Sequence, residues 1–380
     1  MTVLDLSTVG PASRCTRLLA DFGADVVKVG PVPGRGAAGT EPPFFSYAGG
    51  RGTSRVCLDL RDEDARAAFM SLAASADVLI ESFRPGVADR LGIGYTAVSA
   101  RNPKIVYCST SGYGQRGARS GWAGHDLNYL AVSGFLAMGA AEPGAMPPIP
   151  GATVADSAGG GMHAALSIVA SLLARASTGV GAYLDVSVAD GALWLMSLAL
   201  EEALATGAQP APKHDVLSGR YACYSTYMAA DGRWLAVASI EPKFFANLCG
   251  SLGCEKWVER QYDDDVQEEI RADFDAAFAT RDRDSWVATL SATDTCVAPV
   301  LEPSEVVSDP SFEQRGVFVE AQHPLKGRFS QLAPVLAGMP AVVEPVTLPD
   351  PGATQTEERL LRAGLAAEEI HRLRDKGVAT

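Results

Sequence analysis

The chain has 380 residues, 47% hydrophobic and 20% charged, a balance typical of a globular protein large enough for two domains. Its formal net charge of −13 argues against nucleic acid as a partner, because phosphate backbones bind basic surfaces. The seven cysteines are scattered without a CxxC pair, so we expect a reduced, cytoplasmic protein with no structural metal site.

The N-terminal segment predicts a strand, a helix and a second strand. Val3–Leu6 is mostly apolar, and we expect no signal peptide because the sequence goes straight into this segment. Arg14–Phe22 has helical spacing, and Ala24–Val29 predicts the next strand. This βαβ order suggests dinucleotide binding, but Ser7–Pro11 lacks a GxGxxG pattern, and the second strand ends without an acidic residue for a ribose. A nicotinamide enzyme is therefore disfavoured.

Residues 31–55 are rich in glycine, proline and arginine. Arg51 and Arg55 lie beside flexible backbone, which fits either a solvated loop or a grip on phosphate groups by bidentate arginine contacts. Further along, Arg84-Pro85-Gly86 follows a strand end, where open α/β sheets place ligand contacts. The residues alone leave both interpretations of the arginine-rich loop open.

Strands alternate with helices up to residue 205, which predicts a mostly parallel sheet covered on both faces. The expected strands are Val56–Leu60, Asp77–Ile80, Lys104–Ser109 and Tyr183–Val188. The expected helices are Asp62–Ala76, His125–Met138, Ser157–Ala176 and Ala189–Ala205. The most apolar run, Met162–Leu173, is too short to span a bilayer and predicts a buried helix.

The pattern changes after a proline-containing linker. Arg220–Met228 and Arg233–Ser239 alternate and are separated by residues 229–232, which predict a hairpin turn, and helices follow at Pro242–Leu252, Asp263–Ala279 and Asp282–Ser291. We therefore expect an α/β fold with a large doubly wound, Rossmann-like domain and a small α+β domain. The expected limits are 1–205 for the large domain, 206–219 for a linker, 220–318 for the small domain, 319–350 for a return linker and 351–380 for C-terminal helices that pack back on the large domain.

Three residues are candidates for proton transfer. His125 carries an imidazole, the side chain most often used to take or give a proton at physiological pH. Asp156 stands at a helix start, where aspartate is a common N-cap, and the following Gly159–Gly161 suggests that something approaches this turn closely. Backbone N–H groups there can hold a negative oxygen such as an enolate. Glu241 enters a helix before Pro242, a routine place for an acid beside the helix dipole.

The chain resembles the CaiB/BaiF family, also called family III CoA transferases, and within it the α-methylacyl-CoA racemases. The resemblance covers nearly the whole length, and its most specific motifs are GHD-x-NYL and Ile-Glu-Pro-x-Phe. The matching segments are Leu19–Val29, Asp77–Gly94, Gly121–Leu130, Asp156–Gly161, Ala230–Phe245 and Thr356–Gly377.

The resemblance implies an interlocked homodimer with shared active sites and an acyl-CoA thioester as substrate, with no tightly bound cofactor. In the racemases the motif positions that match His125 and Asp156 carry the proton-transfer residues, and the one that matches Glu241 pairs with the histidine. The resemblance also suggests the cations that would meet the CoA phosphates, namely Arg51, Arg55, Arg84 and Lys28.

Competing hypotheses remain open at this point. A CoA transferase of the same family would use the aspartate at Asp156 as a nucleophile and form an aspartyl-CoA intermediate. A CoA-binding protein without catalysis is the third hypothesis. The chain also departs from the racemase pattern at Ser218–Tyr221, where an arginine and a tyrosine replace small residues near the expected acyl path. This departure puts the usual branched-chain acyl specificity in doubt.

Overall fold

The computed structural model describes residues 1–34, 42–334, 338, 342 and 344–380. The chain forms two compact units. The large unit contains Met1–Phe135, Ile149–Leu198 and Pro310–Thr380, and the small unit contains Leu136–Pro148 and Ala199–Asp309. The domain limits expected from the sequence stay predictions. Residues 136–148 lie within the expected large domain but belong to the small unit.

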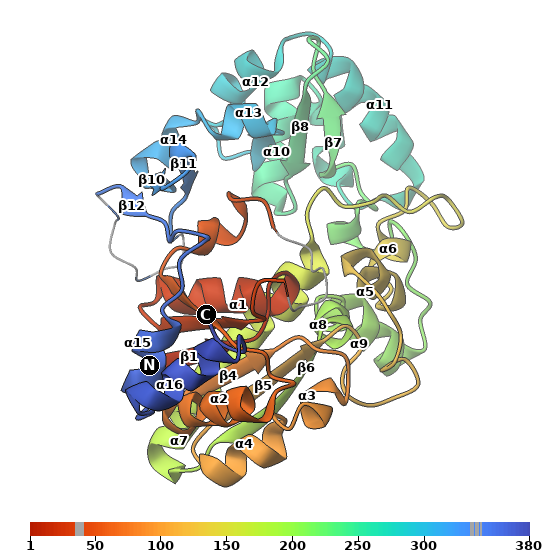
Figure 1. Ribbon diagram of the computed structural model, residues 1–380. Helices are drawn as coiled ribbons and strands as arrows, with labels where there is room; N and C mark the ends of the chain where they lie inside the picture. Colours follow the sequence, from red (N-terminus) through yellow and green to blue (C-terminus); the bar gives the residue numbers. More distant parts are fainter. Residues whose placement is uncertain (35–41, 335–337, 339–341, 343) are drawn as a thin grey trace. The chain divides into compact units, whose positions relative to one another are not determined.

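A six-stranded parallel sheet forms the centre of the large unit (Figure 1). Its strands are β1 Thr2–Asp5, β2 Asp25–Gly30, β3 Thr53–Cys57, β4 Val78–Glu81, β5 Val106–Ser111 and β6 Ala182–Ser187. Their order, β3-β2-β1-β4-β5-β6, is that of a Rossmann-like sheet, so the expected fold class is confirmed. The order reverses between β1 and β4, and sheets of this kind bind ligands beyond the carboxyl ends of the strands at such a point.

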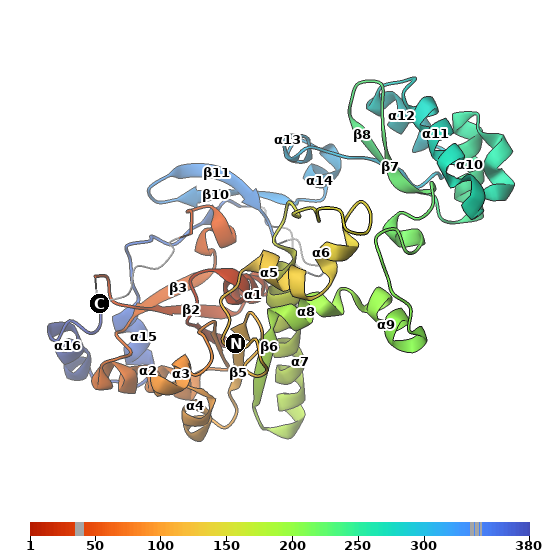
Figure 2. The same cartoon turned by 90° about the vertical axis from the view of Figure 1, so that its right-hand side faces the viewer.

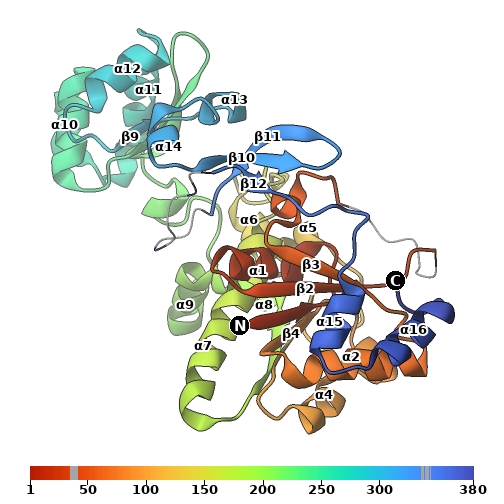
Figure 3. The same ribbon diagram turned by 60° about the vertical axis from the view of Figure 1, so that its left-hand side comes forward.

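Helices cover both faces of this sheet. The helices of the large unit are α1 Gly10–Asp21, η1 Ser46–Gly50, α2 Glu63–Ser75, α3 Val87–Arg90, α4 Tyr95–Arg101, α5 Asp126–Val132, η2 Ala155–Met162, α7 His163–Thr178, α8 Val188–Trp194, α14 Pro310–Gln314, α15 Thr356–Arg362 and α16 Ala367–Asp375. The C-terminal helix α15 packs beside α2 and β3, although 280 residues of chain, 76–355, separate it from α2 (Figure 3). Both C-terminal helices belong to the large unit, and the expected limits of the C-terminal segment stay predictions.

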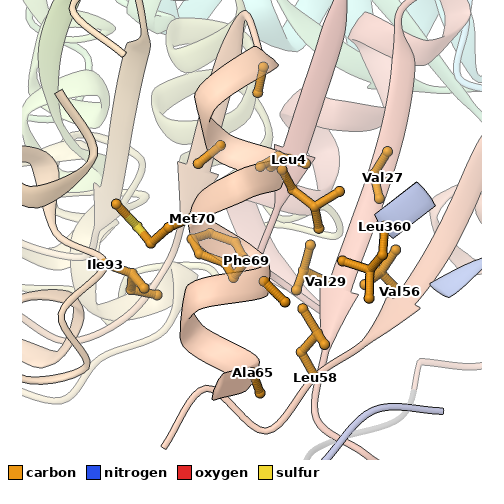
Figure 4. Packing of buried hydrophobic residues seen from close by; sticks show 14 of the residues in the cluster. Leu4, Val27, Val29, Val56, Leu58, Ala65, Phe69, Met70, Ile93 and Leu360 are labelled. Carbon is orange, nitrogen blue, oxygen red and sulfur yellow. The ribbon is translucent and has the colours of Figure 1, made fainter. Parts of the chain in front are cut away.

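Buried apolar side chains lie on both faces of the sheet, where alternate residues of β1 enter two different cores. Val3 belongs to the core under α1 and α7, whereas Leu4 belongs to the core under α2 and α15. In the second core Phe69 of α2 points toward Leu4 and Val29, and it is fully buried (Figure 4). Burial of each such side chain stabilises the fold by roughly 1.5–3 kcal/mol.

Helix α7 does not match the prediction of a buried helix. Ala164 and Ile168 face the sheet and are fully buried, but Leu166, Val169 and Leu173 on the opposite face are 70%, 51% and 76% exposed. With η2, α7 forms a continuous helix, Ala155–Thr178, which is the one described segment long and apolar enough to cross a membrane. A single helix of this kind is weak evidence for a membrane protein.

The small unit joins an antiparallel sheet to a helical layer. Its strands are β7 Tyr224–Met228, β8 Trp234–Ala238 and β9 Val297–Pro299. Its helices are η3 Val216–Ser218, α10 Pro242–Leu252, η4 Glu255–Arg260, η5 Asp264–Val266, α11 Gln267–Phe278, α12 Arg283–Leu290 and α13 Pro303–Val306. The predicted hairpin is confirmed, with Gly232 in the left-handed conformation at φ 77°. Aromatic residues such as Tyr227 and Phe278, whose ring centroids lie 5.2 Å apart, fill its core.

Three segments show the limits of sequence periodicity. The helix expected over His125–Met138 is broken into α5 and α6 Phe135–Met138 at Gly134, whose φ is 85°. The helix expected over Ala189–Ala205 is likewise two helices, α8 and α9 Ser197–Thr206. The expected return linker contains a small sheet of the large unit, formed by β10 Phe318–His323, β11 Gly327–Leu332 and β12 Val346–Thr347.

Candidate active site

His125 immediately precedes α5 and is the N-cap of that helix. Its backbone is extended, at φ −131° and ψ 177°, and its N–H donates to Oδ1 of Asn128 at 3.0 Å. Asn128 therefore fixes the point at which α5 begins. The His125 side chain is exposed. The GHD-x-NYL motif thus places its histidine at the start of a helix, where the side chain of the asparagine three residues later binds the histidine N–H.

Asp126, which the sequence did not single out, connects α5 to η2. Its Oδ1 accepts a hydrogen bond from the backbone N–H of Asp156 at 2.8 Å. The bond joins residues 30 positions apart and brings the start of α5, with His125, to the first turn of η2. Because this N–H is already occupied by Asp126, it is not an open donor for an enolate oxygen. The only sequence signal for Asp126 was its place beside His125 in the motif.

Asp156 lies in the first turn of η2, a π-helical segment that continues into α7. The N-cap residue of η2 is Val154, so the interpretation of Asp156 as an N-cap is wrong. Burial raises the pKa of Asp156, and the charge of Asp126 raises it further, whereas the charges of Arg14 and His125 lower it. The hydrogen bond from its N–H to Asp126, the residue after His125, places Asp156 near the start of α5. Single π-turns of this type often occur at functional sites.

The glycine cluster after Asp156 is explained by close packing of helices. A β-carbon at Gly159 would lie 2.8 Å from the backbone nitrogen of Ala192 on α8, and one at Gly160 would lie 2.6 Å from Cβ of Pro11 on α1. Helices α1, α5 and α8 all contact η2, and Figure 2 shows them gathered on one side of the sheet. The close approach that the glycines indicated is therefore made by the protein's own helices.

Tyrosine side chains connect α5 to the loop that precedes it. The Tyr129 hydroxyl donates to the carbonyl oxygen of Gly124 at 2.6 Å, and the Tyr113 ring packs edge-on against Tyr129 with centroids 5.1 Å apart. Burial, followed by the charge of Asp156, raises the pKa of Tyr129 to about 12. Tyr129 is therefore a neutral wall of the site and keeps the GHD loop against α5.

Two of the four cations expected to meet phosphate groups are already paired inside the large unit. The ammonium of Lys28 forms an ion pair with the fully buried Asp5 and donates to Ser13 Oγ at 3.1 Å. Arg51 is 8% exposed, binds Asp21 through two nitrogens at 2.9 and 3.1 Å, and donates to the Leu332 carbonyl at 3.0 Å. These contacts account for both side chains without a ligand, and their phosphate-binding role stays a prediction.

Arg55 and Arg84 are more open. Arg55 donates to the carbonyl oxygen of Pro351 at 2.9 Å. Arg84 is exposed in the loop after β4, and the described part of the chain provides no hydrogen-bond partner for its guanidinium. This loop adjoins the point where the strand order reverses, which is the position expected for a ligand contact.

A buried glutamate supports the Arg84 loop. Oε2 of Glu81 accepts from the Phe83 N–H at 2.6 Å, and its Oε1 forms a hydrogen bond with the Ser109 hydroxyl. Glu81 is 3% exposed and, with Arg84 and Tyr107, lines a cavity of about 190 Å³. Burial raises its pKa to about 7, and the charges of Asp89 and Asp185 act in the same direction. Sequence reasoning missed this residue, because its strand end reads simply as apolar.

Glu241 belongs to the small unit, where it is the N-cap residue of α10. Its side chain is exposed and forms no capping hydrogen bond. Burial, followed by the charge of Glu241, raises the pKa of the Cys296 thiol. The pairing of Glu241 with a histidine stays a prediction.

The departure at Ser218–Tyr221 has a local explanation in the small unit. Arg220 binds Asp264 through two nitrogens at 2.8 and 3.0 Å, and its guanidinium carbon lies 5.4 Å from the centroid of the Tyr221 ring. Its effect on acyl specificity stays a prediction.

Comparison with known proteins identifies the family. The family model described as "CoA-transferase family III" matches residues 1–355 of the chain. The chain belongs to this CaiB/BaiF family. It is 35% identical over 379 residues to the alpha-methylacyl-CoA racemase of Homo sapiens, covering 98% of this chain and 95% of that protein. It is also 30% identical over 338 residues to the acetyl-CoA:oxalate CoA-transferase of Acetobacter aceti, covering 84% of this chain and 85% of that protein.

The solved structures agree with the family assignment. Rv3272 from M. tuberculosis superimposes with a TM-score of 0.77 at 26% identity, covering 94% of this chain and 96% of that one. Family III proteins include both racemases and CoA transferases, so membership establishes an enzyme family that acts on CoA thioesters.

Proposed function

We propose that this chain is a racemase that inverts the α-carbon of 2-methylacyl-CoA thioesters by proton transfer. The observation that carries the proposal is the hydrogen bond from the Asp156 N–H to Asp126, the residue after His125, which brings the start of α5 to the first turn of η2. The 35% identity with the human racemase over nearly the full length supports it. Inversion needs a base on one face of the α-carbon and an acid on the other, and His125 and Asp156 supply both.

The proposed reaction has two proton transfers. The base removes the α-proton, and the C–H electron pair moves toward the thioester carbonyl to form an enolate. The conjugate acid of the second group then donates a proton to the opposite face, and the carbonyl is restored. In the reverse direction the two groups exchange roles. The raised pKa of Asp156 favours its protonated form more than in an exposed aspartate, which suits a group that must also donate a proton.

The test is α-proton exchange in D2O. Wild-type protein incubated with 2-methylacyl-CoA esters, without any added carboxylic acid, should incorporate deuterium at the α-carbon. His125→Gln and Asp156→Asn should each reduce the rate by a factor of about 100 or more, since each group acts directly on the proton. His371→Asn, an exposed histidine on α16, is the matched control and should retain full activity. Absence of exchange with every ester tested would reject the racemase proposal.

A CoA transferase is the second candidate, because the same family contains transferases and Asp156 is a half-buried carboxylate. In that reaction the Asp156 carboxylate attacks the thioester carbonyl, CoA thiolate leaves, and a mixed anhydride forms. The thiolate then attacks the aspartyl carbonyl and releases the acyl carboxylate, which leaves an aspartyl-CoA thioester. Hydroxylamine should trap this thioester as a hydroxamate at Asp156, and detection of that adduct by peptide mass spectrometry would favour the transferase.

We propose further that the protein is a cytoplasmic homodimer in which a second copy supplies Glu241 to His125. The exposed apolar face of α7, formed by Leu166, Val169 and Leu173, supports an association of this kind. Leu173→Glu places a charge in this face and should convert a dimer to a monomer in analytical ultracentrifugation. A wild-type protein that sediments as a monomer at micromolar concentration would contradict the dimer.

A further inference from the structure

The Arg14 side chain, on α1, lies beside Asp156 and has no role in the proton transfers described above. Its Nη2 donates to the Thr153 hydroxyl at 2.6 Å, three residues before Asp156. A β-carbon added at Gly161 would lie 2.8 Å from Cβ of Arg14, so the stem of Arg14 packs on η2. The charge of Arg14 also acts on Asp156, where it opposes the effect of burial. These observations place a cation within the candidate active site.

The guanidinium of Arg14 has no carboxylate partner. In the described part of the chain no acidic side chain, Asp156 included, lies within ion-pairing distance of it, and its Nε is buried without a hydrogen-bond partner. The neighbouring cations differ, because Arg17 lies 3.9 Å from Asp21 and Arg51 binds the same carboxylate at 2.9 Å. Partly buried arginines are normally paired, so the anion for Arg14 is expected to come from outside the chain.

Tyr47 holds this guanidinium in place. The Arg14 guanidinium carbon lies 5.5 Å from the centroid of the Tyr47 ring, and the Tyr47 hydroxyl accepts from the Gly10 N–H at 2.9 Å. Tyr47 adopts a left-handed backbone conformation, at φ 50° and ψ 41°, that non-glycine residues rarely adopt. One face of the guanidinium is therefore covered and one nitrogen is held by Thr153. The remaining Nη1 edge is left for an anion, for which a preorganised arginine is well suited.

We propose that Arg14 determines substrate specificity by binding a carboxylate group at the end of the acyl chain that is remote from the thioester. The preferred substrates would then be CoA thioesters whose acyl chain ends in a carboxylate, in place of neutral branched alkyl chains. This inference rests on the proposed function, because the acyl group must reach Asp156 for Arg14 to contact it. A different role for Arg14, such as stabilising the enolate or Asp156 itself, would affect carboxylated and neutral substrates equally.

The test compares two matched thioesters, 2-methylsuccinyl-CoA and 2-methylbutanoyl-CoA, which differ by a carboxylate in place of a methyl group. Their dissociation constants are measured by isothermal titration calorimetry, which needs no turnover. Wild-type protein should bind the carboxylated ester more tightly by a factor of about 10 to 100, as expected for one charged hydrogen-bonded pair. Arg14→Gln should remove this preference and change the affinity for 2-methylbutanoyl-CoA less than about twofold.

Two further variants complete the design. Arg14→Lys keeps the charge but not the planar fork, and should retain part of the preference. Arg17→Gln, one turn further along α1, controls for general damage to the helix and should bind both esters like the wild type. Circular dichroism checks that each variant is folded.

The outcomes separate the two proposals. Equal affinity of the wild type for both esters, or an equal loss for both in Arg14→Gln, would overturn the role of Arg14. A preference for the carboxylated ester without α-deuterium exchange would overturn the racemase proposal and leave the specificity assignment standing. Failure to bind either ester would contradict both.

Discussion

The buried carboxyl group of Glu81 makes a quantitative prediction about stability and pH. In the folded protein its pKa rises from 4.5 to about 7, mainly because of burial. Between these two values the folded state binds more protons than the unfolded state, so stability falls as pH rises. A tenfold change in an ionisation constant corresponds to about 1.4 kcal/mol. The free energy of unfolding therefore falls by about 3 kcal/mol in total, and the fall is complete above pH 7.

Glu81→Gln removes this titration and keeps the local contacts. A glutamine oxygen can accept from the Phe83 N–H. The Ser109 hydroxyl donates to Oε1 of Glu81 in the wild type, and it can rotate to accept from the glutamine NH2 group. We expect the free energy of unfolding of the wild type to fall relative to that of Glu81→Gln by about 2 to 3 kcal/mol between pH 5 and pH 8.

The assay is urea unfolding of both proteins at several pH values between 5 and 8, with the difference between them as the result. Glu368→Gln, an exposed glutamate on α16, is the matched control and should follow the wild type at every pH. If the stabilities of the wild type and Glu81→Gln change in parallel with pH, the protonation assigned to Glu81 is refuted.

Two further predictions concern the surroundings of Asp156. Asp126→Asn removes a charge that raises the pKa of Asp156 but keeps an oxygen that can accept from the Asp156 N–H. The acid limb of the pH profile for α-deuterium exchange should therefore shift to lower pH. An unchanged profile would contradict the effect of Asp126 on Asp156. Gly191→Ala would place a β-carbon 1.9 Å from the Gly159 carbonyl oxygen and should destabilise the protein by about 1–3 kcal/mol in thermal unfolding. The control Gly151→Ala, whose β-carbon meets nothing within 4 Å, should leave the stability unchanged. Equal melting temperatures for the two variants would contradict the tight packing of η2 against α8.

Local sequence patterns determined most of the secondary structure. Helix α10 was predicted with the bounds that the structure has, because Pro242 starts it and Gly253 ends it in the left-handed conformation. The β7–β8 hairpin was predicted from alternation and from the turn that contains Gly232. The alternation of strands and helices was sufficient to predict the Rossmann-like sheet. The motifs were sufficient to select His125 and Asp156 as candidate site residues.

Only the tertiary structure decided which side chains meet. Lys28 and Arg51 looked available for phosphate, but their partners Asp5 and Asp21 lie 23 and 30 residues earlier in the chain. Asp126 bonds to the Asp156 N–H across 30 residues, and Arg14 bonds to Thr153, in the segment before Asp156, across 139 residues. Periodicity reports the environment of a residue within one element, whereas ion pairing, burial and pKa depend on contacts between elements that are distant in sequence. The composition of this site therefore became visible only once α1, α5 and α8 were packed around η2.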